Sequence, residues 1–316
     1  MFSSSRRMPR RSYDGMAPVM YSPRRQRTIS KTVRVSGFGY WSGNDVDVEF
    51  RPAAAGAGVT FVRNDLAKPV SIPVSVNNRI ETPRRTTLRA GGVSVEMVEH
   101  ILAALGGMQV DNCEIAVNAP EMPGMDGSSA PFVEAIVSAG IVEQDQSRPS
   151  LVVRDVTRLG NAESWIEARP VASAGMSVKF HLDYGADNAI GRQTLTLAVT
   201  PESFRRELAP ARTFMLKSEA DWLLAQGLGK RATMQDLLVF DSQGPIDNEV
   251  RYHDECVRHK TLDLIGDLAL AQCDFVGHFI AYRSGHRLNA DLVRALIVEA
   301  EWVGVNESPR KIRKAG

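Results

Sequence analysis

Two stretches of this chain carry the same helical pattern, and each has a histidine at the same place. Residues 98–107 read VEHILAALGG, and residues 257–266 read VRHKTLDLIG. A pattern that recurs within one chain is the sequence signature of a duplicated structural unit. The chain is therefore expected to contain two similar halves, each with a histidine on a helix. The aligned positions are His100 with His259, Leu105 with Leu264, and Gly107 with Gly266.

The second copy of the pattern carries two acids at helical spacing. Asp263 lies four residues after His259, and Asp267 lies eight residues after it. A period of 3.6 residues places all three on one helix face. A His/Asp pair at this spacing is also common as a salt link on a helix. The repeat favours a metal site, because packing the two halves together would add His100 as a third ligand. Three protein ligands leave the fourth tetrahedral position of a zinc ion open for water.

Two further residues are candidates for proton transfer. Glu99 precedes His100 directly and is not needed as a ligand, so it is a candidate general base for water at the metal; the alternative is a surface acid in the first helical turn. His286 is expected in a loop before the last helix, with Asp267 orienting its imidazole, or as an ordinary polar histidine. Basic residues near these positions suit an anionic substrate or stand in solvent: Lys260, Arg283 and Arg287. Packing or surface roles are expected for His181, His253 and His278.

Charge is distributed unevenly along the chain. Of the 316 residues, 43% are hydrophobic and 24% are charged, which is the balance of a soluble globular protein with room for two domains. Residues 1–27 hold seven Arg and one acid, so they contribute +6 to the net charge of +1 and leave −5 for the remainder. The acidic remainder argues against a nucleic-acid partner. The leader is expected to be a disordered tail or an overlong start, with a transit peptide as the alternative.

Cysteine usage and hydropathy bound the compartment. The three cysteines are odd in number and lack CxxC spacing, so we expect core residues in a reducing cytoplasm rather than a disulfide framework: Cys113, Cys256 and Cys273. No run approaches 18 apolar residues, so no membrane span is expected. The basic residues that end the chain allow a weak contact with anionic lipid head groups. We expect a monomer.

Strand and helix patterns follow the same order in both halves. In the first half, alternating strands precede a helix that begins near Ser94 or Glu96, and a strand at 112–119 precedes a second helix capped by Ser128 or Ser129. The polar stretch EQDQSRPS reads as a linker between the halves, and an insertion in the second half carries a helix at 217–226 and a strand at 236–240. The predicted division is a disordered leader (1–27), a first half (28–145), a second half (150–304) with an insertion at about 210–245, and a basic tail (305–316).

These segments together resemble the UDP-3-O-acyl-N-acetylglucosamine deacetylases, the zinc amidases of lipid A biosynthesis. From about Gln26 to Val303 the motifs occur in the family's order: QRTISKTV, RPAAAGAGVTFVR, VEHILAALGG, DNCEIAV, PEMPGMDGSSAPFV, ARTF, HKTLDLIGDL and SGHRLN. The resemblance implies an α+β fold of two duplicated two-layer α/β sandwich domains whose helix layers face each other. It also implies hydrolysis of the 2-acetamido group of an acylated UDP-sugar to release acetate, the committed step of lipid A biosynthesis.

The resemblance also assigns roles to residues. It assigns Zn²⁺ to His100, His259 and Asp263, ligands that Fe²⁺ would fit as well, and the general base to Glu99. By the same resemblance, Thr213 in ARTF would donate a hydrogen bond to the oxyanion. His286, held by Asp267, would protonate the leaving amine. The residues implied to line the substrate cleft are Phe214, Lys260 and Arg283.

The chain departs from the family pattern at two places. GFGYWSG has Tyr40 and Trp41 where Leu-His is common, which alters a cleft contact. GLGKRATMQDLLVF places Lys230 and Arg231 where a small apolar stretch usually lines the acyl passage, so the accepted acyl chain is expected to be affected. Neither departure touches the implied zinc or proton-transfer residues, and activity is expected to survive.

Two other classes of protein compete with this interpretation. A two-His-one-carboxylate iron oxygenase would use the same kind of ligands, but those ligands normally stand on jelly-roll strands rather than helices. A catalytically silent sugar or lipid binder would be expected to lack the base or a ligand, and neither is missing here.

Overall fold

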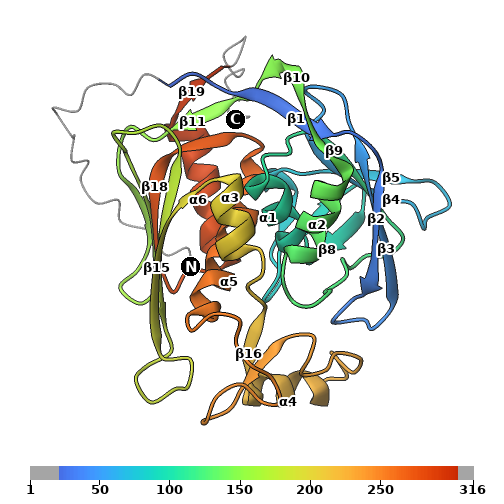
Figure 1. Ribbon diagram of the computed structural model, residues 1–316, viewed down its shortest axis with the longest axis vertical. Coiled ribbons are helices and arrows are strands. Elements are labelled where there is room, and N and C mark those ends of the chain that lie inside the picture. The colour runs from blue at the N-terminus through green and yellow to red at the C-terminus, as the bar shows by residue number, and fades with distance from the viewer. Residues whose placement is uncertain (1–20, 305–316) are drawn as a thin grey trace, which may run out of the picture.

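Four helices of the molecule lie between two β-sheets. The computed structural model describes residues 21–304, so the first twenty residues of the leader and the basic tail lie outside the described residues. Figure 1 shows one sheet on each side of the molecule, with α1, α2, α5 and α6 filling the space between them. This arrangement is the predicted α+β fold with facing helix layers; the duplication itself stays a prediction.

The first sheet has five strands in the order β2-β3-β9-β4-β5. Strands β4 and β9 are parallel and the other neighbours are antiparallel. Alternation of buried and exposed residues along β3 turns Val46, Val48 and Phe50 toward the helices, as the period of two in a strand requires. The strands are β2 (Val33–Phe38), β3 (Asp45–Pro52), β4 (Val59–Arg63), β5 (Val70–Pro73) and β9 (Cys113–Val117). A smaller sheet beside it contains β6 (Arg79–Ile80), β7 (Thr87–Ala90) and β8 (Val93–Glu96).

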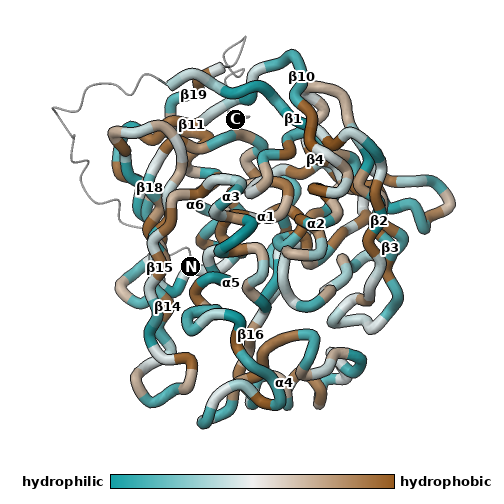
Figure 2. The backbone as a smooth tube through the Cα atoms, in the orientation of Figure 1, coloured by the Kyte–Doolittle hydropathy of each residue, from teal (hydrophilic) through white to brown (hydrophobic). Residues whose placement is uncertain are grey.

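The second sheet has seven strands and is built around the long strand β18. Strand β18 is antiparallel to β13 and parallel to β14 and β11. Figure 2 shows hydrophobic and hydrophilic residues alternating along its strands. The hydrophobic face of the sheet therefore packs against the helices, and the other face is exposed to solvent. The strands are β11 (Ser150–Val152), β12 (Thr157–Gly160), β13 (Trp165–Arg169), β14 (Met176–Asp183), β15 (Arg192–Val199), β18 (Asp274–Tyr282) and β19 (Glu301–Val303).

The two helices that carry the repeated pattern pack directly against each other. Glycine at 266 makes this close approach possible, because a Cβ there would lie 2.1 Å from the carbonyl oxygen of Glu99. Within the described residues, none of the helices is long and apolar enough to cross a membrane. The helices are α1 (Glu99–Gly107), α2 (Ala130–Ala139), α3 (Pro201–Ser203), α4 (Lys217–Ala225), α5 (Glu255–Leu268) and α6 (His286–Glu299). Single turns of 3₁₀ or π helix occur at Val76–Asn78, Phe204–Leu208 and Ala269–Ala271.

The segment read as a linker and the end of the leader form a strand pair instead. Strand β1 (Arg25–Ile29) pairs antiparallel with β10 (Ile141–Ser147), so the folded part begins before residue 28. The polar composition of both segments comes from cross-strand ion pairs, such as Arg27 with Glu143 at 3.2 Å. Such pairs stabilise exposed strands, so the polar stretch is a strand, and its place as the boundary between two halves stays a prediction.

The insertion contains the elements that its sequence predicted. Helix α4 follows β16 (Phe214–Leu216), and β16 pairs with β17 (Leu238–Phe240) in a two-stranded sheet. These elements lie at the lower end of the molecule in Figure 1, away from β1 and β10. Two helix starts differ from the predictions: α1 begins at Glu99 rather than near residue 94 or 96, and α6 begins at His286, which was expected in the loop before that helix.

A candidate metal centre between helices α1 and α5

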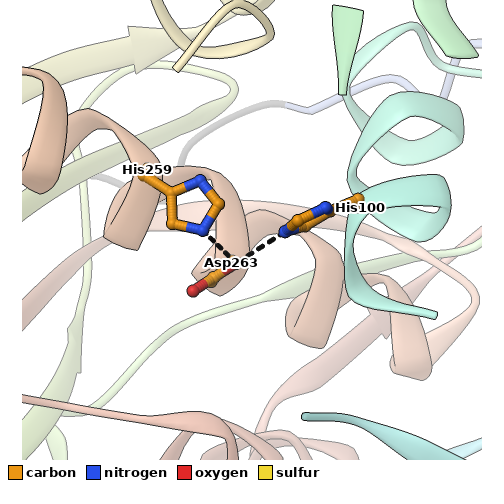
Figure 3. A group of neighbouring side chains, drawn as sticks. All are labelled: His100, His259 and Asp263. Carbon is orange, nitrogen blue, oxygen red and sulfur yellow. Dashed lines mark ion pairs between the residues drawn. The ribbon is translucent and has the colours of Figure 1, made fainter. Parts of the chain in front are cut away.

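Three potential metal ligands meet where α1 and α5 touch. His100 comes from the first turn of α1, and His259 and Asp263 lie one turn apart on α5. Asp263 Oδ1 is 3.6 Å from His100 Nε2 and 3.5 Å from His259 Nε2, and one ligand atom from each residue lies within 4.8 Å of the other two. Figure 3 shows the carboxylate between the two imidazoles. The two repeated helices are thus in contact at their aligned histidines, as predicted.

These distances fit a metal ion with tetrahedral ligands. Zinc bonds of about 2.0–2.1 Å at a tetrahedral angle separate neighbouring ligand atoms by about 3.3 Å, close to the spacings here. Asp263 Oδ1 is buried and has no hydrogen-bond partner among the described residues. A buried carboxylate oxygen without a donor is costly unless a cation or proton satisfies it. The donor set therefore fits a divalent ion.

The protonation states of the ligands also suit metal binding. Burial lowers the pKa of His259 to about 4, against an opposing effect of Asp263. Its Nδ1–H donates to the carbonyl of Ala211 at 3.1 Å, so the Nε2 lone pair is the one directed at the site. Burial alone would raise the pKa of Asp263, but Lys260 and His259 hold it well below its usual range. The Lys260 ammonium donates to Asp263 Oδ2 at 2.7 Å and leaves Oδ1 for the metal.

Glu99 stands beside the three ligands without joining them. Its side chain is buried, and burial raises its pKa while His286 and His100 oppose the rise. One carboxylate oxygen, Oε2, accepts a hydrogen bond from the backbone N–H of Thr86 at 2.9 Å. The other, Oε1, lies 4.0 Å from His286 Nε2. A carboxylate with a raised pKa next to a metal can act as a general base.

His286 and Asp267 form the pair that the sequence suggested. His286 Nδ1–H donates to Asp267 Oδ2 at 2.9 Å. Burial alone would lower the pKa of His286, but Asp267 and then Glu99 raise it to about 9. The imidazole is therefore a cation near neutral pH. His286 is the first residue of α6 rather than a loop residue, because Gly285 caps that helix in an extended conformation.

A cavity of about 1100 Å³ opens from these residues. Thr213 lies in its wall, and its hydroxyl donates to the carbonyl of Gly127 at 3.1 Å. The cavity is also lined by the three residues assigned to the substrate cleft, Phe214, Lys260 and Arg283. Many of the other wall residues are apolar, and most of these belong to the insertion: Met97, Leu182, Leu216, Leu223, Leu224, Leu228, Met234, Leu237 and Val239.

The two departures from the family pattern have different positions. Tyr40 and Trp41 both line the cavity, and the Tyr40 hydroxyl donates to the carbonyl of Asp236. Lys230 and Arg231 are exposed and do not line the cavity. Arg231 instead lies over the ring of Phe38 at 4.4 Å and pairs with an aspartate on β3. Neither basic residue therefore lines the cavity, and their effect on the accepted acyl chain stays a prediction.

Several buried residues around the site were missed by the sequence reasoning. Thr86 and Asn289 donate hydrogen bonds to Asp267, and Ser284 donates to Asn289 Oδ1. The Arg212–Glu255 ion pair, at 2.8 Å, fixes the backbone between Ala211 and Thr213. Arg212 in ARTF was the available signal, since a charged residue between two site residues needs a partner when it is buried. Thr86 gave no signal, because its partners lie far away in the sequence.

The chain is similar to known proteins over most of its length. Residues 26–298 match the family described as UDP-3-O-acyl N-acetylglycosamine deacetylase. A protein of that name from Actinobacillus succinogenes is 39% identical over 281 residues, covering 88% of this chain and 91% of the relative. Relatives of the same name are 39% identical in Thermosynechococcus vestitus, covering 86% and 93% of the two chains, and 38% identical in Myxococcus xanthus, covering 89% and 88%.

Proposed function

Because the chain belongs to the family of UDP-3-O-acyl-N-acetylglucosamine deacetylases, we propose that His100, His259 and Asp263 bind the metal ion used in this deacetylation. The enzyme is a hydrolase that removes the acetyl group of UDP-3-O-acyl-N-acetylglucosamine, a step of lipid A biosynthesis. The observation that supports the metal site best is the buried, unpartnered Asp263 Oδ1 between two imidazole nitrogens. We propose Zn²⁺ as the metal, with Fe²⁺ as the alternative that the same ligands accept.

The chain's own residues divide the proton transfers between them. A divalent ion held by His100, His259 and Asp263 would lower the pKa of water and polarise the amide carbonyl. Glu99 takes the proton from the attacking water, since its pKa is raised by burial and it lies next to His100. His286 is the cation that donates a proton to the leaving amine, and Asp267 holds the imidazole in place. Water and amide thus become acetate and a free amine.

Thr213 is proposed to assist at the substrate carbonyl. Its hydroxyl lies in the cavity wall, and it donates to the carbonyl of Gly127 in the absence of substrate. Rotation of the hydroxyl would direct this donor toward the oxygen on which charge develops, which is how oxyanion donors lower a barrier. The ion pair between Arg212 and Glu255 keeps the backbone of this segment in place.

The cavity suits the two ends of an acylated UDP-sugar. Lys260 and Arg283 provide positive charge for the diphosphate, and Phe214 adds an aromatic wall. The apolar wall residues of the insertion, such as Leu223 and Leu237, suit the acyl chain. We propose that the chain folds as two halves, residues 28–145 and 150–304, and that both halves contribute residues to the site. Residues 25–27 extend the first half, since they belong to strand β1. We also propose that the enzyme is a cytoplasmic monomer with at most weak contact to membrane lipids.

Acetate release from UDP-3-O-(3-hydroxyacyl)-N-acetylglucosamine tests this function. The purified protein would be assayed before chelation, after chelation, and after return of Zn²⁺ or Fe²⁺, across several acyl lengths. Turnover that is lost on chelation and restored by one of the metals is expected. Absence of turnover with every chain length, despite one bound metal per protein, would contradict the proposal and favour a silent binder.

A further inference from the structure

Two carboxylates with different roles share one neighbour, the threonine at position 86. Thr86 lies outside the helices, between β6 and β7, and its side chain is fully buried. Its hydroxyl donates to Asp267 Oδ1 at 2.6 Å, and its backbone N–H donates to Glu99 Oε2 at 2.9 Å. Thr86 does not line the cavity, so it has no place from which to touch the substrate.

These contacts form a ring that is open at one point. From Glu99 the ring passes through Thr86 to Asp267, and from Asp267 to His286 through the 2.9 Å hydrogen bond at Nδ1. The remaining distance, 4.0 Å, separates His286 Nε2 from Glu99 Oε1. The proposed proton acceptor and proton donor therefore face each other across the one opening of the ring.

The ring also decides which atoms remain free to react. The Thr86 N–H occupies Glu99 Oε2, so Oε1 is left for the proton of the attacking water. At Asp267, the Thr86 hydroxyl occupies Oδ1, and Asn289 and His286 share Oδ2. The carbonyl of Thr86 accepts from the N–H of Val98 at 3.3 Å, which fixes the threonine to the start of α1.

We propose that Thr86 is a positioning residue that holds the side chains of Glu99 and His286 in the relative positions needed for the two proton transfers. This inference rests on the proposed function, because it assumes that these two residues carry the protons. The hydroxyl matters separately from the backbone: it holds Asp267, and Asp267 holds His286. A change that removes only the hydroxyl should therefore slow the chemical step while the metal and the substrate still bind.

The adjacent threonine provides a matched control. Thr87 is as buried as Thr86, but its hydroxyl has no hydrogen-bond partner among the described residues. Valine has the shape of threonine without the hydroxyl, so Thr86→Val and Thr87→Val delete the same group from neighbouring sites. Thr86→Ser retains the hydroxyl and should restore most of the activity.

The experiment measures kcat, KM, metal content and thermal unfolding for these three variants and for Glu99→Gln. We expect Thr86→Val to lower kcat about 10- to 100-fold, the usual range for losing a buried hydrogen bond to a charged group, with KM and metal content unchanged. Thr86→Ser and Thr87→Val should stay near the parent enzyme. If Thr86→Val does not fold, Thr86→Ala removes the same hydroxyl with less steric demand and should give the same result.

Two results would overturn the inference. The first is a Thr86→Val enzyme with the parent kcat while Glu99→Gln is inactive, which would leave the proposed function intact. The second is loss of metal or of folding in both Thr86→Val and Thr86→Ala, since the hydroxyl would then serve the scaffold. An active Glu99→Gln enzyme would instead contradict the proposed function itself.

Discussion

Helices α1 and α5 share a sequence pattern but use it differently. Their aligned histidines meet, with ring centroids 5.1 Å apart. Their aligned glycines do not play equivalent parts: a Cβ at Gly266 would strike the main chain of Glu99, whereas a Cβ at Gly107 would strike the ring of Phe204. A repeat therefore predicts which positions face the junction, but the two copies contact different neighbours there.

The helices also differ in where they hold their functional side chains. In α1 the two polar residues stand in the first turn, and the rest of the helix is apolar or glycine. In α5 the acids and the histidine occupy successive turns of one buried face. The short helix thus holds the proposed base at its first residue, whereas the long helix holds a row of side chains that runs from the proposed metal site to Asp267, the partner of His286.

The largest effect is expected from removing either histidine of the junction. His100→Ala and His259→Ala should each lose the metal and reduce acetate release to background, because two remaining ligands bind an ion poorly. Metal content by atomic emission, measured after desalting, checks this. His181→Ala is the control, since the side chain of that histidine bonds Thr194 on the second sheet at 2.9 Å and does not line the cavity. Full metal retention in one of the two junction variants would show that the helices contribute unequally.

The next effect separates the carboxylates of the two helices. Glu99→Gln should lower kcat about 10²- to 10⁴-fold, the contribution of a general base, while the metal remains bound. Asp267→Asn should lower kcat by only about 10- to 100-fold, since it acts through His286. Steady-state kinetics with metal analysis of both variants checks the order. An equal loss in the two would mean that Asp267 does more than orient the imidazole.

The sequence allowed us to predict the site residues within the two repeated helices, but not the residue that contacts both helices, Thr86. The cluster of His100, His259 and Asp263 could be predicted because histidines at matching helical positions meet when equivalent helices pack together. Thr86 could not, because its role depends on a loop that touches α1 and α5 at once. The strand pair β1 and β10 was hidden for another reason: its stabilising contacts are ion pairs, and composition alone does not distinguish them from a linker.

A smaller effect concerns the packing of the two helices. Gly266→Ala should lower the free energy of unfolding by about 3 kcal/mol, the upper part of the range for overpacking, because the new Cβ would lie 2.1 Å from a backbone oxygen. Gly106→Ala is the control on α1: its Cβ would lie 3.4 Å from Ala269 Cβ, and alanine favours the helix by about 0.5–1 kcal/mol. Urea unfolding of both variants measures the difference. Equal stabilities would show that the helices can separate without cost.

The smallest effect tests which helix holds the proton of His286. In metal-free protein, NMR titration of this imidazole should give a midpoint near its pKa of about 9. Asp267 on α5 raises the pKa of His286 more than Glu99 on α1 does, so Asp267→Asn should shift the midpoint to lower pH further than Glu99→Gln. The larger shift in Glu99→Gln would reverse the assignment.

The same raised pKa fixes the sign of a stability change with pH. His286 binds its proton more tightly when folded than at the ordinary value of 6.5, so its contribution to stability is complete below that pH and is lost as the pH rises through about 9. Comparison of urea unfolding at pH 6 and 10 in parent and His286→Gln proteins isolates this contribution. The variant should lose less stability than the parent over that interval, because it has no imidazolium to deprotonate. An equal loss in both proteins would mean that the acids of α1 and α5 do not stabilise the cation between them.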